Sequence, residues 1–336
     1  MAAEPRIVRL SELETGQSGD CFVILTEKNR HTTRDGKPFY RIGFRDSARA
    51  VTAMVWQDSA WFEECESQWQ PDQYYKIRCR YEETSYGPQV DIDRIREVVE
   101  ADTADGFDIA EFHPHTRFDI DELEQRLRQI AQEEISDPAL KRLVLELLID
   151  HAELLRKLPA ATRNHHAYTG GYLEHVVAVT ETAVYLADKY DTHYPNMQPR
   201  LSKSLVVAGA ILHDVGKIAE LRYRPQGSQY TAEGRLIGHI LLGRDMVREK
   251  AATIPDFDAE VLLRLEHIIV AHQNLPEWGS PVAPHTPEAL LVHIADDADA
   301  KFHMLAMALS APADNSEFTD RQNPLRRTIF RGFVDE

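Results

Sequence analysis

The hydrophobic pattern of this chain changes period near residue 100, and that change limits the folds open to it. Before it, apolar and polar residues alternate at period two, for example in PFYRIGFR at 38–45, as in half-buried strands. After it, apolar residues recur at i, i+3 and i+4, as in amphipathic helices. A chain of 336 residues is long enough for about two domains. We therefore expect an all-β domain followed by an all-α domain.

The first hundred residues are expected to form a small barrel. The expected strands lie at 21–28, 38–45, 49–56, 73–82 and 89–95, and one short helix is expected at 58–69. Asp35-Gly36 between the first two strands is a favourable hairpin turn. Three strands, a helix and two further strands favour the OB-fold. Barrels of this kind commonly bind single-stranded nucleic acid by aromatic stacking and a basic groove.

The segment from residue 28 to residue 49 is rich in basic and aromatic side chains. It holds seven Lys and Arg residues, and Asp35 and Asp46 are its acidic residues. Alternation places Arg41 and Phe39 on one face of their strand and Tyr40 on the other. One face must form the core, and a charged hairpin is also typical of a soluble edge strand. The candidate nucleic-acid contacts in this segment are Arg34, Lys37, Phe39 and Arg41.

The remaining residues divide into a linker, a helical domain and a tail. Residues 101–117 are acidic and irregular, so we expect a linker there between a domain at 1–100 and a helical domain at 118–310. Residues 311–336 are expected to form a C-terminal tail that packs on the helical domain. The expected helices lie at 119–132, 137–157, 171–190, 201–214, 232–252, 258–272 and 286–309.

Histidine and aspartate interrupt the apolar faces of several of these helices. His213-Asp214 ends an unusually apolar run, SLVVAGAIL. Burial of an imidazole beside a carboxylate is costly unless hydrogen bonds or a metal ion compensate. Further residues of this kind are His175, His239, His272 and Asp296. Each of these residues alone is more often a hydrogen-bonded core residue, but together they favour a divalent metal site. The lack of a nearby cysteine argues against a zinc site with thiolate ligands.

The ordered set of His175, His213-Asp214 and Asp296 resembles the H…HD…D pattern of the HD-domain metal-dependent phosphohydrolases. The chain also resembles the YhaM-type 3′–5′ exoribonucleases, which join an N-terminal OB-fold to a C-terminal HD domain. The matching stretches are 165–175, 209–217, 230–243, 267–281 and 287–301, with a similar tail motif, EFTDRQNPLRR. This resemblance implies an all-β OB-fold barrel followed by an all-α HD-domain bundle, and a homo-oligomer.

The resemblance implies one or two divalent ions in each chain. The implied ligands of the first ion are His175, His213, Asp214 and Asp296. In a two-metal site, Asp214 would bridge to a second ion held by His239 and His272. Related proteins often carry a histidine where this chain has Gln273, and an amide is a poorer ligand than imidazole. Mn²⁺ is the expected ion, with Fe²⁺, Mg²⁺, Co²⁺ and Zn²⁺ as alternatives.

Four more residues are candidates for direct roles in catalysis or binding. Lys217 would contact a phosphate oxygen or developing negative charge, or else be a solvated lysine at a helix end. His165 and His166 would contact phosphate or donate a proton to the leaving 3′-oxygen, or else belong to a glycine-rich turn. Trp278, in a Pro/Gly loop, would stack on a base or cover the core.

These residues lead to one principal hypothesis and two alternatives. The first is a metal-dependent 3′–5′ exonuclease that hydrolyses single-stranded RNA to nucleoside monophosphates, with single-stranded DNA as a further candidate substrate. The second is an HD-domain phosphohydrolase of small or cyclic nucleotides, which needs no polymer groove. The third is a nucleic-acid-binding protein with a vestigial HD site.

The net charge of −17 argues at first against a nucleic-acid partner. Residues 1–100 carry 14 basic and 18 acidic residues, whereas the rest of the chain carries 24 and 37. Most of the acidity therefore belongs to the helical half, where some carboxylates would coordinate cations. Nucleic-acid binding is then expected to depend on a local groove and on the metal site.

The sequence also indicates a compartment. No apolar stretch approaches the roughly 20 residues that cross a bilayer, and the N-terminal residues lack a secretory signal pattern. Cys21, Cys65 and Cys79 form no disulfide framework. We therefore expect a cytoplasmic protein without a membrane partner.

Overall fold

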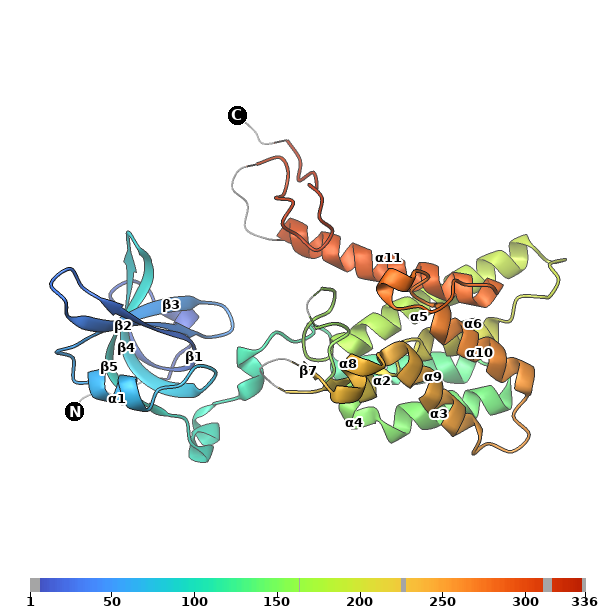
Figure 1. The fold of residues 1–336 in the computed structure, drawn as a ribbon, viewed down its shortest axis with the longest axis horizontal. Coiled ribbons are helices and arrows are strands. Elements are labelled where there is room, and N and C mark those ends of the chain that lie inside the picture. The colour runs from blue at the N-terminus through green and yellow to red at the C-terminus, as the bar shows by residue number, and fades with distance from the viewer. Residues whose placement is uncertain (1–6, 163, 225–227, 311–315, 334–336) are drawn as a thin grey trace. The chain divides into compact units, whose positions relative to one another are not determined.

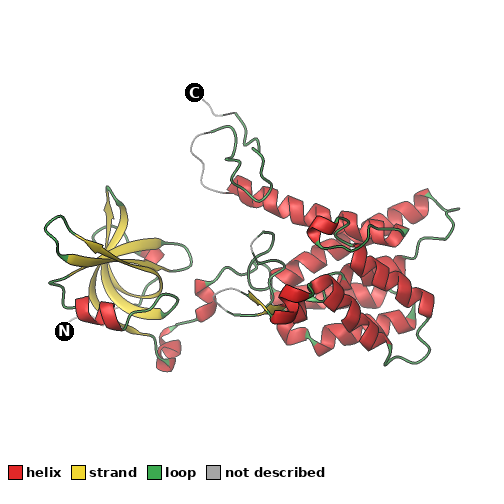
Figure 2. Ribbon diagram, viewed as in Figure 1, coloured by secondary structure: helices red, strands yellow, loops and turns green. Residues whose placement is uncertain are grey.

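The computed structural model describes residues 7–162, 164–224, 228–310 and 316–333 and divides the chain into two compact units (Figure 1). The first spans Met1–Pro114 and the second spans His115–Glu336. Within the described residues, the first unit contains the five long strands, and the second contains helices joined by loops and one short two-stranded sheet (Figure 2). Each unit has its own hydrophobic core.

The first unit is a closed barrel with the strand order β1-β2-β3-β5-β4. Its elements are β1 (Ser18–Thr32), β2 (Pro38–Arg45), β3 (Ala50–Trp56), α1 (Phe62–Ser67), β4 (Tyr74–Thr84) and β5 (Gly87–Glu97). The long β1 closes the barrel because it pairs with β2 through one stretch and with β4 through another. This order, with a helix between the third and fourth strands, confirms the expected OB-fold.

The faces of β2 settle which of its aromatic side chains belong to the barrel core. Tyr40, Ile42 and Phe44 are buried, whereas Arg41 is exposed and Phe39 is half-buried on the outer face. Apolar burial of this kind is the main favourable contribution to folding. Tyr40 and Phe44 are therefore unable to stack on a base, while Phe39 stays accessible.

The residues that follow β5 continue to pack on the barrel as far as Pro114. They form two short 3-10 helices, η2 (Glu100–Asp105) and η3 (Ile109–Phe112). Phe107 and Phe112 pack against Phe22 in a small apolar cluster. The stretch expected to be a linker, 101–117, therefore includes residues that belong to the first unit.

The second unit is a bundle built around one apolar helix. Its helices are α2 (Ile120–Glu134), α3 (Pro138–Asp150), α4 (Ala152–Leu155), α5 (Gly171–His193), α6 (Lys203–Leu212), α7 (Lys217–Glu220), α8 (Ala232–Leu236), α9 (His239–Ala251), α10 (Ala259–Ala271) and α11 (Pro287–Ser310). All residues from 204 to 212 of α6 are buried, and α6 packs on α5, α10 and α11 (Figure 1). A short sheet pairs β6 (Leu221–Arg222) with β7 (Gln229–Tyr230). No helix within the described ranges combines the length and the apolar character needed to cross a membrane.

Two of the expected helices are each divided into two. The segment 232–252 breaks before His239, because Gly238 has φ +81° and ψ 154°, a conformation that ends a helix and favours glycine. The segment 137–157 breaks at His151, between α3 and α4. Apolar residues continue in a helical rhythm through both breaks, so periodicity alone predicted one helix in each place.

The described part of the tail, residues 316–333, folds back on itself as a closed loop. Phe318 and Phe330 form an isolated antiparallel bridge, and the amide of Thr319 donates to the carbonyl of Ile329 at 2.9 Å. The Arg331 guanidinium donates to the carbonyl of Ala308 on α11 at 3.5 Å. Residues 311–315 of the expected tail lie outside the described residues.

Candidate metal centre and adjoining pocket

The six residues proposed as metal ligands converge in the second unit, although they come from separate helices. His175 lies on α5, His213 and Asp214 follow α6, His239 begins α9, His272 follows α10, and Asp296 lies on α11. Of these side chains, His175, His213 and His272 are fully buried and Asp214 is 2% exposed. Two groups of three ligand atoms form, and the atoms within each group lie within 4.8 Å of one another.

His175, His213 and Asp296 form the first group. Nε2 of His175 lies 3.3 Å from Nε2 of His213 and 3.3 Å from Oδ1 of Asp296. Nε2 of His213 lies 3.8 Å from the same carboxylate oxygen. Three ligand atoms from three segments therefore surround one small volume.

Asp214, His239 and His272 form the second group. Oδ1 of Asp214 lies 3.3 Å from Nε2 of His239 and 3.7 Å from Nε2 of His272. Oδ2 of Asp214 faces the first group, 3.5 Å from His213 and 3.7 Å from His175. Asp214 therefore stands between the two groups with one oxygen toward each.

The outer ring nitrogen of each of these histidines is held by an oxygen acceptor. A bond of this kind fixes the ring and leaves the inner nitrogen aimed at the centre. The four bonds join Nδ1 of His213 to Ala210 O (2.7 Å), of His272 to Ile269 O (2.7 Å), of His239 to Glu220 Oε1 (3.0 Å) and of His175 to Asp299 Oδ2 (2.7 Å). The four rings are therefore preorganised to present Nε2.

Two buried atoms at the centre show that the residues present fit a divalent cation. Among the described residues, Oδ1 of Asp214 and Nε2 of His272 are buried without a hydrogen-bond partner, and they lie 3.7 Å apart. Burial of such unpartnered atoms costs about 1–3 kcal/mol for each group. A cation bound to both atoms removes that cost, and nitrogen and oxygen donors suit Mn²⁺, Fe²⁺, Co²⁺ and Zn²⁺.

The pKa shifts at the centre favour a charged carboxylate on Asp214 and a neutral imidazole on His272, the forms that bind a cation. Burial alone would raise the pKa of Asp214, but Lys217 and His213 outweigh burial and hold that pKa well below its usual range. Burial lowers the pKa of His272 to about 4, so its imidazole is neutral at neutral pH. Burial also opposes protonation of His175, yet hydrogen bonds with Asp296 and Asp299 raise its pKa to about 9. Without a metal ion, the proton on Nε2 of His175 partly neutralises the carboxylates.

A pocket of about 470 Å³ adjoins the centre. Its lining includes Asp214 and Asp296 from the centre, His165 and Lys217 among the predicted catalytic residues, and Trp278. The tail loop also contributes to the lining, through Pro324, Leu325 and Arg327. The pocket therefore brings most of the residues predicted to act on a substrate next to the candidate metal ligands.

Comparison with known families agrees with this arrangement. Residues 172–301 match the family model of the HD domain. The HD domain indicates a metal-dependent hydrolase, and the His/Asp groups described above are able to hold the metal. With the barrel before it, the chain has an OB-fold plus HD-domain arrangement.

Two solved structures of an OB domain of replication protein A from Methanococcus maripaludis are similar to part of the chain. They share 12% and 13% identity, cover 27% and 28% of this chain, and are covered over 94% and 96% of their own length. Their TM-scores are 0.23 and 0.22.

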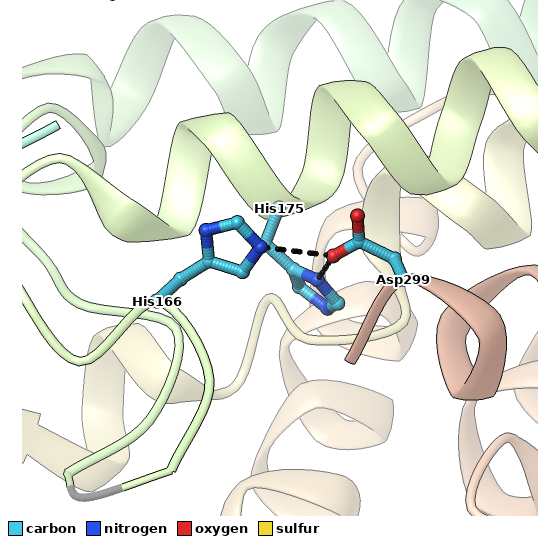
Figure 3. A group of neighbouring side chains, drawn as sticks. All are labelled: His166, His175 and Asp299. Atoms are coloured by element: carbon cyan, nitrogen blue, oxygen red, sulfur yellow. Dashed lines mark hydrogen bonds and ion pairs between the residues drawn. The ribbon is translucent and has the colours of Figure 1, made fainter. Parts of the chain in front are cut away.

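Asp299, on α11 of the HD domain, was not among the predicted site residues. Its Oδ2 accepts hydrogen bonds from Nδ1 of His175 at 2.7 Å and from Nε2 of His166 at 3.1 Å, and Figure 3 shows the carboxylate facing both rings. The position of Asp299 three residues after Asp296, on the same helical face, is the signal that would have found it. Asp299 thus orients His175, one of the candidate metal ligands, through its outer ring nitrogen.

The structure separates the two predicted catalytic histidines. His165 lines the pocket, and burial lowers its pKa to about 3, so its imidazole is neutral at neutral pH. His166 is 4% exposed, does not line the pocket, and bonds to Asp299 and to the Tyr168 hydroxyl, at 2.8 Å. Its geometry is that of a residue that positions Asp299.

Lys217 and Trp278 both line the pocket, but Lys217 is buried and Trp278 is about half exposed. Lys217 is 6% exposed and donates to Oδ2 of Asp214, so it is not a solvated lysine at a helix end. Trp278 is 49% exposed, and Nζ of Lys301 lies 5.5 Å from the centroid of its ring. Gln273, in place of the second histidine of related proteins, also lines the pocket, and its amide nitrogen lies 3.4 Å from Nε2 of His239.

Gly216 determines how closely α7 and α9 approach within the HD domain. A Cβ atom at Gly216 would lie 1.9 Å from the carbonyl oxygen of His239 and 2.4 Å from the amide nitrogen of Gly243. Both neighbours are backbone atoms, which no side-chain rotation can move. The absence of a side chain at this position therefore allows His239 to reach Asp214.

On the barrel, a row of three aromatic rings crosses the outer face of β1, β2 and β3. His31 pairs in register with Phe39, and Phe39 pairs with Trp56. The ring centroids lie 5.4 Å apart for His31 and Phe39, and 4.8 Å apart for Phe39 and Trp56. Of the predicted contacts, Arg34 and Lys37 lie exposed at the adjacent β1–β2 turn, and Arg41 is exposed on β2. Sequence reasoning missed His31 and Trp56, because cross-strand register decides their place.

Proposed function

We propose that this protein is a metal-dependent 3′–5′ exonuclease that hydrolyses single-stranded RNA to nucleoside monophosphates, with single-stranded DNA as a further candidate substrate. The observation that carries the proposal is that the pocket joins a two-group His/Asp centre to cationic and aromatic side chains. Asp214 and Asp296 line the pocket beside Lys217, His165 and Trp278. These groups suit a phosphodiester at the centre and a base against the indole.

The ligand assignment remains the one made from the resemblance. His175, His213, Asp214 and Asp296 would hold one ion, and His239 and His272 would hold a second ion bridged by Asp214. A bound divalent ion, Mn²⁺ by expectation, supplies activation of water and stabilisation of charge on the phosphate.

The other residues of the pocket have separate roles in this proposal. Lys217 stabilises negative charge that develops on the phosphodiester, since its ammonium group is buried beside Asp214. His165 contacts the phosphate with a neutral imidazole and donates its ring proton as a hydrogen bond. Trp278 stacks on the terminal base with the exposed part of its ring. A volume of about 470 Å³ is within the range of small-ligand pockets and suits one terminal nucleotide.

The barrel would hold the strand upstream of the cleaved nucleotide. The row of His31, Phe39 and Trp56 offers stacking surfaces, which are sequence-tolerant because every base has a π-face. Arg34, Lys37 and Arg41 would contact phosphates near this row. Such contacts act locally, as the acidic average charge of the chain requires.

A small-nucleotide phosphohydrolase is the second candidate, because the same pocket volume suits a free nucleotide. The two functions differ in their dependence on the barrel. Loss of the aromatic row would weaken hydrolysis of long strands in an exonuclease and would leave a small-nucleotide hydrolase unaffected.

The deciding experiment follows mononucleotide release from labelled single-stranded RNA in the presence of Mn²⁺. The wild type should release nucleoside monophosphates stepwise from the 3′ end, Asp214→Ala should release none, and Trp56→Ala should be slower on long strands only. Intact RNA across a series of divalent metals would contradict the proposal. A metal-free centre in protein purified without chelator would instead favour the non-enzymatic alternative, a binding protein with a vestigial site.

We also propose that the chain is divided into residues 1–100, 101–117, 118–310 and 311–336, that it forms a homo-oligomer and that it acts in the cytoplasm.

A further inference from the structure

The loop formed by residues 318–330, here called the tail loop, lies against the pocket of the HD domain. Pro324, Leu325 and Arg327 line the same pocket as Asp214 and Asp296. The tail loop is closed at its base by the bridge between Phe318 and Phe330. The loop therefore adds a wall to the pocket that no helix supplies.

The tip of the tail loop is held in shape by the side chain of Asn323. Its amide nitrogen donates to the carbonyl of Asp320 at 2.6 Å and to the carbonyl of Arg327 at 2.7 Å. Its side-chain oxygen accepts from the amide of Leu325 at 3.0 Å. Leu325 and Arg327 line the pocket, and the backbone of each is hydrogen-bonded to the Asn323 side chain, so the wall has a defined shape.

Arg327 differs from the other cations of the pocket in having no acidic partner. Nζ of Lys217 is bonded to Asp214, and Nζ of Lys301 lies 2.7 Å from Asp297. Within the described ranges, the exposed Arg327 guanidinium takes part in no ion pair. A guanidinium binds a phosphate through two parallel hydrogen bonds, and Arg327 is free to do so.

We propose that the tail loop restricts this site to the end of a nucleic-acid strand. Arg327 binds a phosphate of the strand next to the scissile one, and Pro324 and Leu325 block the pocket beyond one nucleotide. An internal phosphodiester has chain on both sides and is excluded by that wall. The inference rests on the proposed exonuclease and assigns its end specificity to residues outside the metal centre.

The test of Arg327 uses the full-length protein loaded with Mn²⁺ and two substrates. Arg327→Gln should raise KM for linear single-stranded RNA roughly 10-fold or more and leave kcat within about 2-fold. On bis(p-nitrophenyl) phosphate, a small diester without a neighbouring phosphate, its loss in kcat/KM should be much smaller than on RNA. Arg321→Gln is the matched control, because Arg321 is an exposed arginine of the same loop outside the pocket lining. An unchanged KM in Arg327→Gln, or an equal rise in Arg321→Gln, would overturn the role of Arg327.

The test of the wall uses Pro324→Gly with Leu325→Gly, and a circular single-stranded RNA that has no end. The wild type should leave the circle intact, whereas the double variant should cut it. A double variant with the thermal stability and metal content of the wild type that still leaves the circle intact overturns the wall.

The failure of the proposed function has its own signature in these assays. A wild type that hydrolyses the small diester and degrades no linear RNA contradicts the exonuclease itself. If the wild type degrades linear RNA and the tail-loop variants behave like the wild type, only the tail-loop proposal is contradicted.

Discussion

Nδ1 of His175 lies 2.7 Å from Oδ2 of Asp299, and this bond fixes the ring whose other nitrogen faces Asp296. The same carboxylate oxygen accepts from His166, which is itself bonded to Tyr168. The candidate metal centre is thus supported by a hydrogen-bond network of His166, Tyr168 and Asp299, none of which lines the pocket. Networks of this kind set the orientation and basicity of a metal-binding histidine.

Replacement of Asp299 by Asn should weaken metal binding without removing a ligand. An amide keeps the acceptor for Nδ1 of His175 but loses the negative charge behind the ring, so we expect a loss of about 10- to 100-fold in Mn²⁺ affinity. Isothermal titration calorimetry measures it. Asp191→Asn is the control, because Asp191 is an acidic residue of α5 paired with Arg200 away from the centre. Equal affinities in wild type and Asp299→Asn would contradict this role.

Removal of metal should destabilise the second unit. A ligand that binds only the folded state contributes about 2.7 kcal/mol at 100 times its Kd, which corresponds to roughly 5–10 °C in Tm for a unit of this size. Thermal unfolding with EDTA and with excess Mn²⁺ should show this shift in the wild type. Asp214→Ala should show none, because Asp214 faces both ligand groups. A wild type whose Tm ignores the metal would argue against a bound ion.

Lys217→Met should separate catalysis from metal binding. Loss of the buried ammonium group removes stabilisation of developing negative charge, so kcat for RNA should fall roughly 100-fold. Metal affinity should stay the same or rise, because Lys217 competes with a cation for Oδ2 of Asp214. Parallel measurements of kcat and Mn²⁺ affinity decide the matter. A fall in affinity as large as the fall in kcat would mean that Lys217 supports the centre structurally.

The aromatic row of the barrel should contribute to strand binding. Trp56→Ala removes one stacking surface and should weaken binding of single-stranded RNA roughly 5- to 100-fold. Fluorescence anisotropy at a fixed salt concentration measures the change. Tyr86→Ala is the control, since Tyr86 is 89% exposed at the turn between β4 and β5 and lies outside the row. Equal effects of the two variants would show that the row has no special part in binding.

The ion pair between Asp102 and Arg96 should make the stability of the barrel depend on pH. The hydrogen bonds from Arg96, at 2.6 Å, hold the pKa of the buried Asp102 well below its usual range. A carboxylate with a lowered folded-state pKa stabilises the fold above its unfolded pKa, about 3.9, and loses that effect as the pH falls below it. Asp102→Asn should therefore destabilise the barrel by about 2 kcal/mol at pH 7 and by progressively less below pH 4.

Urea unfolding followed by tryptophan fluorescence at several pH values tests this expectation. The control is Asp105→Asn, because Asp105 contacts Lys76 with a side chain that is 49% exposed. A destabilisation by Asp102→Asn that is the same at pH 7 and pH 3 would contradict the assignment.

The barrel was predictable because its strands alternate, yet alternation did not show which face of β2 was the core. That choice depends on neighbours distant in the sequence, such as Glu66 on α1, which accepts a hydrogen bond from the Tyr40 hydroxyl at 3.0 Å. The break before His239 was missed for a related reason. Leu236 and Ile240 keep the helical period across Gly238, and periodicity carries no information about φ.

The six proposed metal ligands were recognisable because histidine and aspartate are conspicuous on apolar helical faces. Asp299 lies three residues after Asp296 in the segment ADDADAK, but the H…HD…D pattern assigns a role only to Asp296 of that segment, so Asp299 was not recognised. The pocket wall at Arg327 was also missed, since no local pattern relates it to Asp214, more than a hundred residues earlier. Packing between distant segments decides such contacts, and only the three-dimensional structure contains it.

Gly216 contacts the backbone of α9 so closely that it makes the HD domain sensitive at a position without chemical function. In a genetic screen for inactive alleles, substitutions of this glycine should appear beside those of the histidines and aspartates, because any added carbon would collide with the carbonyl of His239. Alanine, the mildest replacement on most surfaces, would be among the damaging ones. The geometry of the centre therefore depends on the lack of a side chain at position 216 as well as on the proposed ligands.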